Sequence, residues 1–597
     1  MNSKTTGIWF VIAAILFALV LFFERQQRHA NAKAAQILVN LQPQSVTSVQ
    51  IIPAGDLEIR ADRTNQMWLL TKPIVYPAQP AAIEALLDAL QKLTPAMRLS
   101  AGELRERPDA EREFGFDSPQ ISLVIEAGEQ RWQLLVGNKT APGDQVFLRV
   151  VGVEGVFVTD ADWLQFIPRT DNDWRDTSLV DANQINDCDW IVVTNGAEII
   201  ELRRDATNHL WHMIRPLQAR ADGDRITDAL QRLQTARVSQ FITDDPKVDL
   251  SAFGLQPADL DLWFGRDTNL VTAIHTGGSL TNDSSQVYAK REGWNAVVTT
   301  ASDPLSPWHG AVNDFRDRHL LELTAPVAEI ESRGEQNFIL QQQEANDWKV
   351  AGENFPTDVE SIQQFIKILA GLRVVEFVKD VVTTPDLQTY GLASSSRQII
   401  LRSAVGDTNA VIAQLLFGTK QTNEVFVRRA DEGFVYAITM DDFNRLPEAG
   451  WEFRERHIWN FTENDVAQIE LHQNGKVRTM IRDGANKWSL APGSQGMINP
   501  PAIEETAHRL GELTAVGWVG RNMTNSTQYG FKPDNLQITI ELKNGAKYTV
   551  DFGAELPPST QTALAAVTLD GERWAFVFPP VLYQFVLSYL TIPANVP

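Results

Sequence analysis

The residues with the spacing of a metal site are few, and each set is incomplete. His209 and His212 are spaced like a pair of metal ligands, but no third ligand accompanies them. Asp171, Asp173 and Asp176 resemble the first part of a calcium loop. Such a loop also needs a glycine at its turn and a distal bidentate glutamate, and both are missing. The sequence therefore predicts no metal site.

Phosphate-binding and acid–base patterns are incomplete in the same way. Gly137-Asn138-Lys139-Thr140 resembles a phosphate loop but lacks the glycine spacing before the lysine. Asp244-Asp245 and Glu504-Glu505 are isolated carboxylate pairs, which we expect on solvated faces. The chain has no nucleophile elbow, no His-Glu-x-x-His and no Gly-rich dinucleotide fingerprint. We predict that the protein is not an enzyme, with no catalytic residue, no cofactor-binding residue and no cofactor.

The chain is organised around a strand that contains Trp68 and the helix that follows it. From Ile83 onward this helix has an apolar residue at every third or fourth position, the period of an amphipathic helix. The same tryptophan, followed by an apolar helix, returns at Trp211, Trp348 and Trp488, at intervals of 143, 137 and 140 residues. We infer four copies of one domain.

The repeated tryptophan has two possible roles. It could form a carbohydrate-stacking platform, but a tryptophan among alternating apolar residues is more typical of a core. We predict that it packs against the helix in each copy, at Trp68, Trp211, Trp348 and Trp488.

An aromatic-Arg-acid triplet ends each of the first three copies and is absent after the fourth. We interpret it as a junction, in which the aromatic ring forms a plug and the arginine forms an ion pair with the next hairpin. The junction residues are Trp174, Arg175 and Asp176, then Phe315, Arg316 and Asp317, and then Phe453, Arg454 and Glu455.

These marks predict an α+β fold, with four tandem copies of an antiparallel-sheet-plus-helix domain of about 140 residues. Units that touch mainly their neighbours should form an elongated array. The predicted segments are a cytoplasmic end (1–6), a transmembrane anchor (7–23), a spacer (24–40) and repeat domains at 41–178, 179–320, 321–459 and 460–597.

Composition agrees with a globular protein that does not bind nucleic acid. Of the 597 residues, 44% are apolar and 21% are charged, so each copy can bury its own core. The net charge of −22 argues against binding to a phosphate backbone, which needs a positive face. The single cysteine, Cys188, excludes an intrachain disulfide.

The N-terminus predicts a membrane anchor. Gly7 to Phe23 is an uncharged apolar run, followed by Glu24 and Arg25. A cleaved signal peptide is the alternative, because Ala30-Asn31-Ala32 has a small-x-small pattern, but this site lies beyond a charged stretch. We expect a single-pass protein of the inner (cytoplasmic) membrane with the bulk of the chain on the periplasmic side.

Several marks together resemble the bacterial family of domain of unknown function 4340 repeats. They are Phe22-Phe23-Glu24-Arg25 after the anchor, the Trp strand and helix, Phe114-Gly115-Phe116 with its equivalents, the turn at Gly137–Thr140 and the closing triplet. The resemblance covers nearly the whole chain after the anchor. It implies a membrane-anchored extracytoplasmic protein, often encoded beside gliding-type ABC transporter subunits, and it supplies no catalytic residues.

Two classes of function stay open. The first is a non-enzymatic accessory or scaffold subunit of an envelope complex, with protein partners in an ABC-type transporter. The second is an extracytoplasmic ligand-binding protein that holds a glycan or a peptide in clefts between the copies.

The last apolar helix, after Pro580, has two interpretations. It either closes its own domain as a cap or leaves an apolar stripe exposed for a partner subunit. The partner-surface candidates are Leu582, Phe585, Val586, Tyr589 and Leu590.

Overall fold

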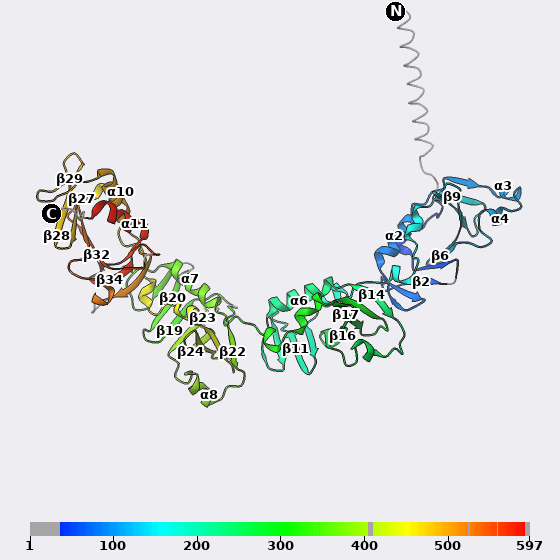
Figure 1. Cartoon of the computed structure of the whole chain (residues 1–597), viewed down its shortest axis with the longest axis horizontal. Helices are drawn as coiled ribbons and strands as arrows, with labels where there is room; N and C mark the ends of the chain where they lie inside the picture. The colour runs from blue at the N-terminus through cyan, green and yellow to red at the C-terminus, as the bar shows by residue number, and fades with distance from the viewer. Residues whose placement is uncertain are drawn as a thin grey trace, which may run out of the picture. The chain divides into compact units, whose positions relative to one another are not determined.

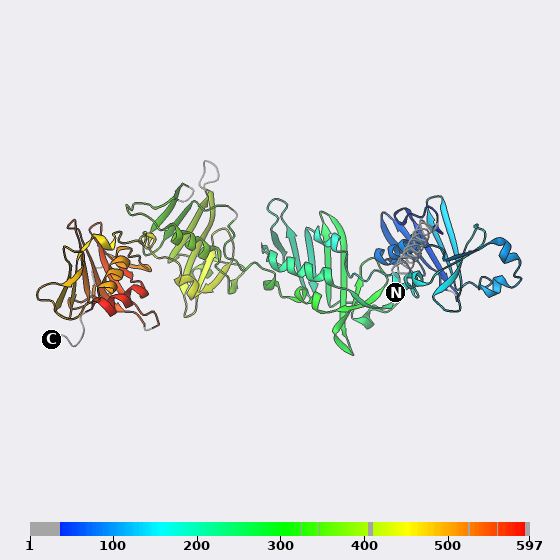
Figure 2. The same ribbon diagram turned by 90° about the horizontal axis from the view of Figure 1, so that it is seen from above.

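The computed structural model describes residues 36–591, apart from residues 56, 324, 345–346, 404–409, 523–525 and 558. The predicted anchor, residues 7–23, lies outside the described residues. Within the described ranges, no helix is both long enough and apolar enough to cross a membrane. The chain divides after Arg316 into two compact units, and each unit contains two antiparallel sheets (Figures 1 and 2).

The first unit contains two nine-stranded sheets with the same topology. Their orders are β4-β3-β2-β1-β6-β7-β8-β9-β5 and β13-β12-β11-β10-β15-β16-β17-β18-β14. The first sheet consists of β1 (Ser48–Pro53), β2 (Ile59–Thr64), β3 (Met67–Lys72), β4 (Tyr76–Pro77), β5 (Met97–Leu99), β6 (Ile121–Ala127), β7 (Gln130–Lys139), β8 (Gln145–Val150) and β9 (Val156–Asp160). The second consists of β10 (Trp190–Asn195), β11 (Glu198–Arg204), β12 (Trp211–Arg215), β13 (Ala219–Arg220), β14 (Val238–Thr243), β15 (Leu260–Arg266), β16 (Asn269–Leu280), β17 (Asp283–Arg291) and β18 (Val297–Ala301).

The second unit repeats this topology with two eight-stranded sheets. Their orders are β21-β20-β19-β23-β24-β25-β26-β22 and β29-β28-β27-β31-β32-β33-β34-β30. The third sheet consists of β19 (Glu329–Arg333), β20 (Phe338–Glu344), β21 (Asp347–Val350), β22 (Glu376–Lys379), β23 (Arg397–Ser403), β24 (Ala410–Lys420), β25 (Glu424–Arg429) and β26 (Val435–Thr439). The fourth consists of β27 (Val466–Gln473), β28 (Lys476–Arg482), β29 (Trp488–Leu490), β30 (Gly517–Arg521), β31 (Gln537–Leu542), β32 (Lys547–Glu555), β33 (Ala563–Leu569) and β34 (Glu572–Val577).

One amphipathic helix lies across one face of each sheet (Figure 2). The four helices are α2 (Pro80–Gln91), α6 (Gly223–Thr235), α7 (Val359–Ala370) and α10 (Pro500–Gly511). Asp222, Asp358 and Asn499 each accept a hydrogen bond from a first-turn amide of the helix that follows. In α2 a proline occupies the first position instead. The apolar side of α2 is buried, as its spacing predicts, and lies in one cluster with β1, β6 and β7.

The remaining helices are short. They are α3 (Ala101–Arg105), α4 (Ala110–Glu113), α5 (Ala182–Asn186), α8 (Thr384–Thr389), α9 (Met440–Asn444) and α11 (Pro580–Phe585). Short 3-10 helices lie between other elements, among them the closing segments, and Val586–Leu590 is a π-helical turn. The antiparallel sheets and the helix on each of them are as predicted. The balance differs from the α+β expectation, because sheets of eight or nine strands make the fold mostly β with some helix.

The glycine that recurs at positions 137, 277 and 418 has a common packing role. A Cβ atom on Gly137 would lie 2.0 Å from the Phe114 carbonyl oxygen, and one on Gly277 would lie 2.0 Å from that of Phe253. The same contact recurs at Gly418 with Tyr390, at 2.1 Å. The predicted turn at Gly137–Thr140 is wrong, because residues 137–139 are the end of β7. Gly137 is a glycine because the Phe114 backbone crosses there, and no phosphate site is needed to explain it.

Replacing Leu86 by Ala should lower the free energy of unfolding of the first copy by about 2–5 kcal/mol. Leu86 lies on the buried face of α2, and the change leaves a cavity between this helix and the sheet. Hydrogen exchange of the β1 and β6 amides would measure the loss. Asp88→Ala, on the exposed side of the same helix, is the matched control and should change stability by less than about 0.5 kcal/mol. Equal effects would show that the buried face does not stabilise the domain.

Candidate functional site

The groups singled out for metal chemistry do not form a site. Among the described residues, no three His, Cys, Asp or Glu side chains gather in a way that could hold a metal ion. His209 lies in an exposed turn before β12, and His212 lies within that strand. Asp173 accepts hydrogen bonds from the Arg169 and Thr170 amides, so it caps a turn.

Cys188 is buried at the end of α5. Burial raises the pKa of this thiol to about 12, so it stays protonated at neutral pH. A protonated, buried thiol is a poor nucleophile. The chemistry of this cysteine therefore adds no candidate active site.

The four repeated tryptophans lie in the cores. Trp68, Trp211, Trp348 and Trp488 are each at most 7% exposed. Trp68 belongs to the cluster of the first sheet and helix, and Trp488 also donates a hydrogen bond from its indole nitrogen to Glu504. These rings are not available as an open carbohydrate platform.

The closing triplet of the first copy runs antiparallel to the segment that leads into α2. The Gln79 amide donates to the Trp174 carbonyl at 2.8 Å, and the Asp176 amide donates to the Pro77 carbonyl at 2.9 Å. Neighbouring side chains of an extended segment point to opposite sides. Trp174 therefore packs into the first core, while Arg175 points away from that core.

Arg175 lies between aromatic rings of two copies. Its guanidinium carbon is 4.6 Å from the ring centre of Tyr76 and 3.8 Å from that of Phe241 in β14. Both terminal nitrogens donate to the Asp244 carboxylate, and one of these bonds, from Nη1 to Oδ2, measures 3.1 Å. The side chain is 1% exposed, so the ion pair and the ring contacts are its main compensation for lost water.

Tyr76 crosses from the first copy into the second. It belongs to β4 of the first sheet, yet it packs in the core cluster of the second. Its ring makes edge contacts with Phe241 at 5.5 Å and with Trp294 at 5.6 Å between ring centres. Burial raises the pKa of its phenol above the usual value. A residue of one domain thus completes the core of the next.

Arg291 adds a second buried cation to this junction. Its guanidinium carbon is 5.2 Å from the Tyr76 ring centre, and Nη1 donates to the Ser178 carbonyl at 3.4 Å. Nε and Nη2 are buried without a hydrogen-bond partner in the described structure. Its guanidinium carbon also lies 5.8 Å from the Trp294 ring centre. Unlike Arg175, Arg291 has ring contacts but no carboxylate partner among the described residues.

Replacing Arg291 by Met should raise the stability of the second copy by about 1 kcal/mol, because it removes a poorly compensated buried charge while keeping an apolar side chain of similar length. The opening free energy of the β15 and β16 amides, from hydrogen exchange, would measure it. A loss of more than about 1 kcal/mol would show that the guanidinium stabilises the junction.

The third and fourth copies form a junction of the same design. Phe453 contacts Phe338 and Phe365 in the third core, at 5.7 and 5.6 Å between ring centres. Arg454 donates to Asp570 at 2.7 Å and lies 4.5 Å from the Trp574 ring centre. The Glu455 amide donates to the Pro356 carbonyl, as Asp176 does to Pro77.

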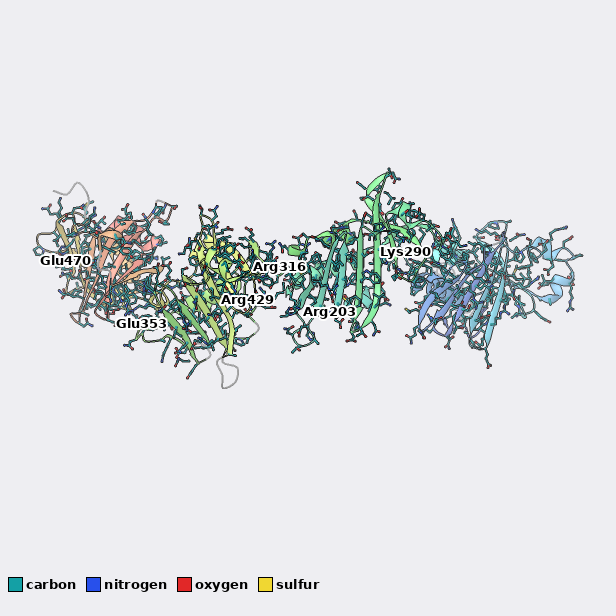
Figure 3. The ribbon with its side chains drawn as sticks, turned by 90° about the horizontal axis from the view of Figure 1, so that it is seen from below. Arg203, Lys290, Arg316, Glu353, Arg429 and Glu470 are labelled. Atoms are coloured by element: carbon teal, nitrogen blue, oxygen red, sulfur yellow. The ribbon has the colours of Figure 1, made fainter. Side chains whose placement is uncertain are left out.

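Phe355 takes the place of Tyr76 in this second junction. It packs against the fourth core and makes an edge contact with Trp574, 5.7 Å between ring centres. A further ion pair joins the copies, because Arg521 Nη1 donates to Glu353 Oε1 at 2.7 Å. The remaining Arg521 nitrogens donate to Glu572, which belongs to the same copy as Arg521. Figure 3 labels Glu353.

In the triplet that ends the second copy, the aromatic residue again packs into the core of its own copy. Phe315 is buried in the second core, stacked 6.3 Å from Trp308. Arg316, labelled in Figure 3, is 1% exposed and donates to Asn313 Oδ1 at 3.1 Å. Asp317 begins the second unit and accepts a hydrogen bond from the His319 amide.

The predicted partner surface at the C-terminal helix needs correction. Leu582, Val586 and Leu590 are buried in the fourth core, so they close their own domain and cannot form an exposed stripe. Phe585 and Tyr589 remain partly exposed, with their ring centres 5.7 Å apart. The Arg509 guanidinium lies over the Phe585 ring. The cap interpretation therefore describes most of this helix.

The sequence did not predict which residues bind the junction arginines. Asp244 was expected on a solvated face, but it accepts the buried Arg175. The sequence marks Tyr76 and Phe355 only weakly as junction residues. Each is an aromatic residue just before the long helix, in the first copy of its unit. Glu504 also differs from expectation, since Arg482 and Trp488 both donate to it.

Comparisons with known proteins bear on the family alone. No curated protein matches the chain. A solved structure, "Crystal structure of the DNA polymerase III subunit beta from Pseudomonas aeruginosa", covers 67% of this chain and 94% of its own, at 8% identity and a TM-score of 0.14. A likeness that weak supports no argument about fold or function.

The family described as "Domain of unknown function (DUF4340)" matches residues 68–209, 211–392 and 348–534. These matches cover most of the chain and repeat along it, in agreement with the repeated sheets. The chain belongs to this family.

Proposed function

We propose that the chain is a membrane-anchored, extracytoplasmic scaffold, a non-enzymatic accessory subunit of an envelope complex associated with an ABC-type transporter. The observation that supports it best is the pair of junctions within the two units. At each junction an aromatic ring and a buried arginine of one copy enter the next copy. Joints of this kind hold neighbouring domains at a fixed angle, which a scaffold needs and a flexible tether does not.

The surroundings of the junctions support the same proposal. Arg175, Arg454 and Arg521 each form an ion pair with a carboxylate at these junctions. The apolar run at residues 7–23 supplies the proposed anchor, with the protein in the inner membrane and its domains outside the cytoplasm.

The location has a direct test. A reporter that is active only outside the cytoplasm, fused after Pro597, should give signal, and the mature chain should keep Met1 or Asn2. A soluble mature form that starts near Lys33 would contradict the anchor, and a silent reporter would contradict the location.

The scaffold role needs a second test, which is purification of the full chain after mild crosslinking in cells. We expect transporter subunits among the captured proteins. Asp244→Asn should reduce their recovery, because it loosens a junction without altering an exposed apolar surface. Capture of no transporter subunit would contradict the proposed partner.

A further inference from the structure

A polar cleft lies between the third and fourth copies, inside the second unit. Its volume is about 360 Å³, within the size range of small-molecule sites. The third copy contributes Gln336, Asn337, Glu353 and Trp451 to its walls, and the fourth contributes Arg521, Asn522 and Glu572.

The cleft contains one guanidinium and two carboxylates, so one negative charge remains in excess. Arg521 donates to Glu353 and makes two hydrogen bonds to Glu572. The hydrogen bonds from Arg521 also lower the pKa of Glu572 below its usual value. Two carboxylates around one occupied guanidinium repel a phosphate or carboxylate ligand. The polar walls equally disfavour an apolar ligand.

The remaining hydrogen-bonding capacity is mixed. Trp451 donates to Gln336 Oε1, Asn337 Oδ1 accepts the Gly334 amide, and Asn522 Nδ2 donates to Glu572. The Gln336 and Asn337 amide nitrogens are therefore left as donors, and Glu353 Oε2 and Asn522 Oδ1 as acceptors, by the side-chain inventory of each residue. An ammonium group could only donate and would leave the amide donors without partners.

A hydroxyl group both donates and accepts, so a hydroxyl-rich ligand can satisfy both kinds of group at once. Trp451 also lines the cleft, where its half-buried indole packs against the fourth core and donates to Gln336, which holds that side chain in place. We infer that this cleft binds a neutral saccharide. The inference goes beyond the scaffold role and does not depend on it, because it uses only the cleft between these two copies.

The test is binding of the full-length chain to an array of neutral and acidic glycans, followed by calorimetry with the best neutral glycan. Spermidine and inorganic phosphate are the probes of other chemistry. We expect binding of a neutral glycan, weakened at least tenfold by Trp451→Ala and by Asn522→Ala, and no binding of spermidine or phosphate. Trp132→Ala, which changes a half-buried tryptophan of the first sheet, is the matched control and should leave the affinity unchanged.

Three outcomes would overturn the inference. They are the absence of neutral-glycan binding across the array, preferential binding of spermidine or phosphate, and an affinity that neither cleft variant changes. Hydrogen exchange of α10 and β30 in each variant checks that the fourth copy remains folded. If Trp451→Ala perturbs these elements, Asn522→Ala, at an exposed position, decides the result. The scaffold proposal fails separately, in the crosslinking experiment.

Discussion

Replacing Tyr76 by Ala should destabilise the second copy by about 3–5 kcal/mol, although Tyr76 belongs to the first sheet. The ring is 3% exposed and fills the second core between Phe241 and Trp294. Its removal leaves a cavity and takes away one ring that compensates Arg175. Hydrogen exchange of the β10, β11 and β12 amides in the full chain would measure the effect.

Tyr76→Phe is the control for this prediction. It keeps the ring and removes only the hydroxyl, so stability should change by less than about 1.5 kcal/mol. If Tyr76→Ala accelerates exchange only in β2, β3 and β4, the ring stabilises its own sheet alone, and the account of the junction is wrong.

Replacing Asp244 by Asn should destabilise the first junction by about 3 kcal/mol. The change keeps the shape of the side chain but leaves the guanidinium of Arg175 buried without a counter-charge. Most of the expected loss is the cost of leaving the Arg175 charge buried without a partner, because water can still reach the Asp244 side chain, which is 32% exposed. Exchange of the Gln79 and Asp176 amides, which bond across the closing segment, would measure the loss.

Asp228→Asn is the matched control, because Asp228 forms an exposed ion pair with Arg232 on α6. Such a pair contributes about 0.3–0.5 kcal/mol, so this variant should behave almost as the wild type. Equal effects of the two variants would show that the buried pair does not stabilise the junction.

The sequence predicts the parts of the fold that depend on local patterns. The period of α2, the tryptophan before it and the repeat interval all follow from residues close together in the chain. The closing triplets were recognisable because an aromatic residue and an arginine stand side by side, and strand geometry sends them to opposite sides.

The receiving side of each junction could not be predicted in this way. Asp244 lies 69 residues from Arg175, and Asp570 lies 116 residues from Arg454. The two acids occupy different positions in their copies. Asp244 follows an edge strand, whereas Asp570 lies in a hairpin turn. In the fourth copy the edge strand β30 ends with Arg521, so the end of this strand carries a positive side chain where the second copy has the negative Asp244. A repeat pattern cannot reveal partners that differ from copy to copy.

Hydrogen exchange of the full chain at increasing urea concentrations tests whether the junctions couple neighbouring copies. We expect the most protected amides of the first and second copies to open together, with the same free energy and the same dependence on urea, because Tyr76 and Arg175 connect the two cores. Tyr76→Ala should separate them into two openings. If the two copies open independently in the wild-type chain, with free energies that Tyr76→Ala leaves unchanged, the junctions do not couple the domains.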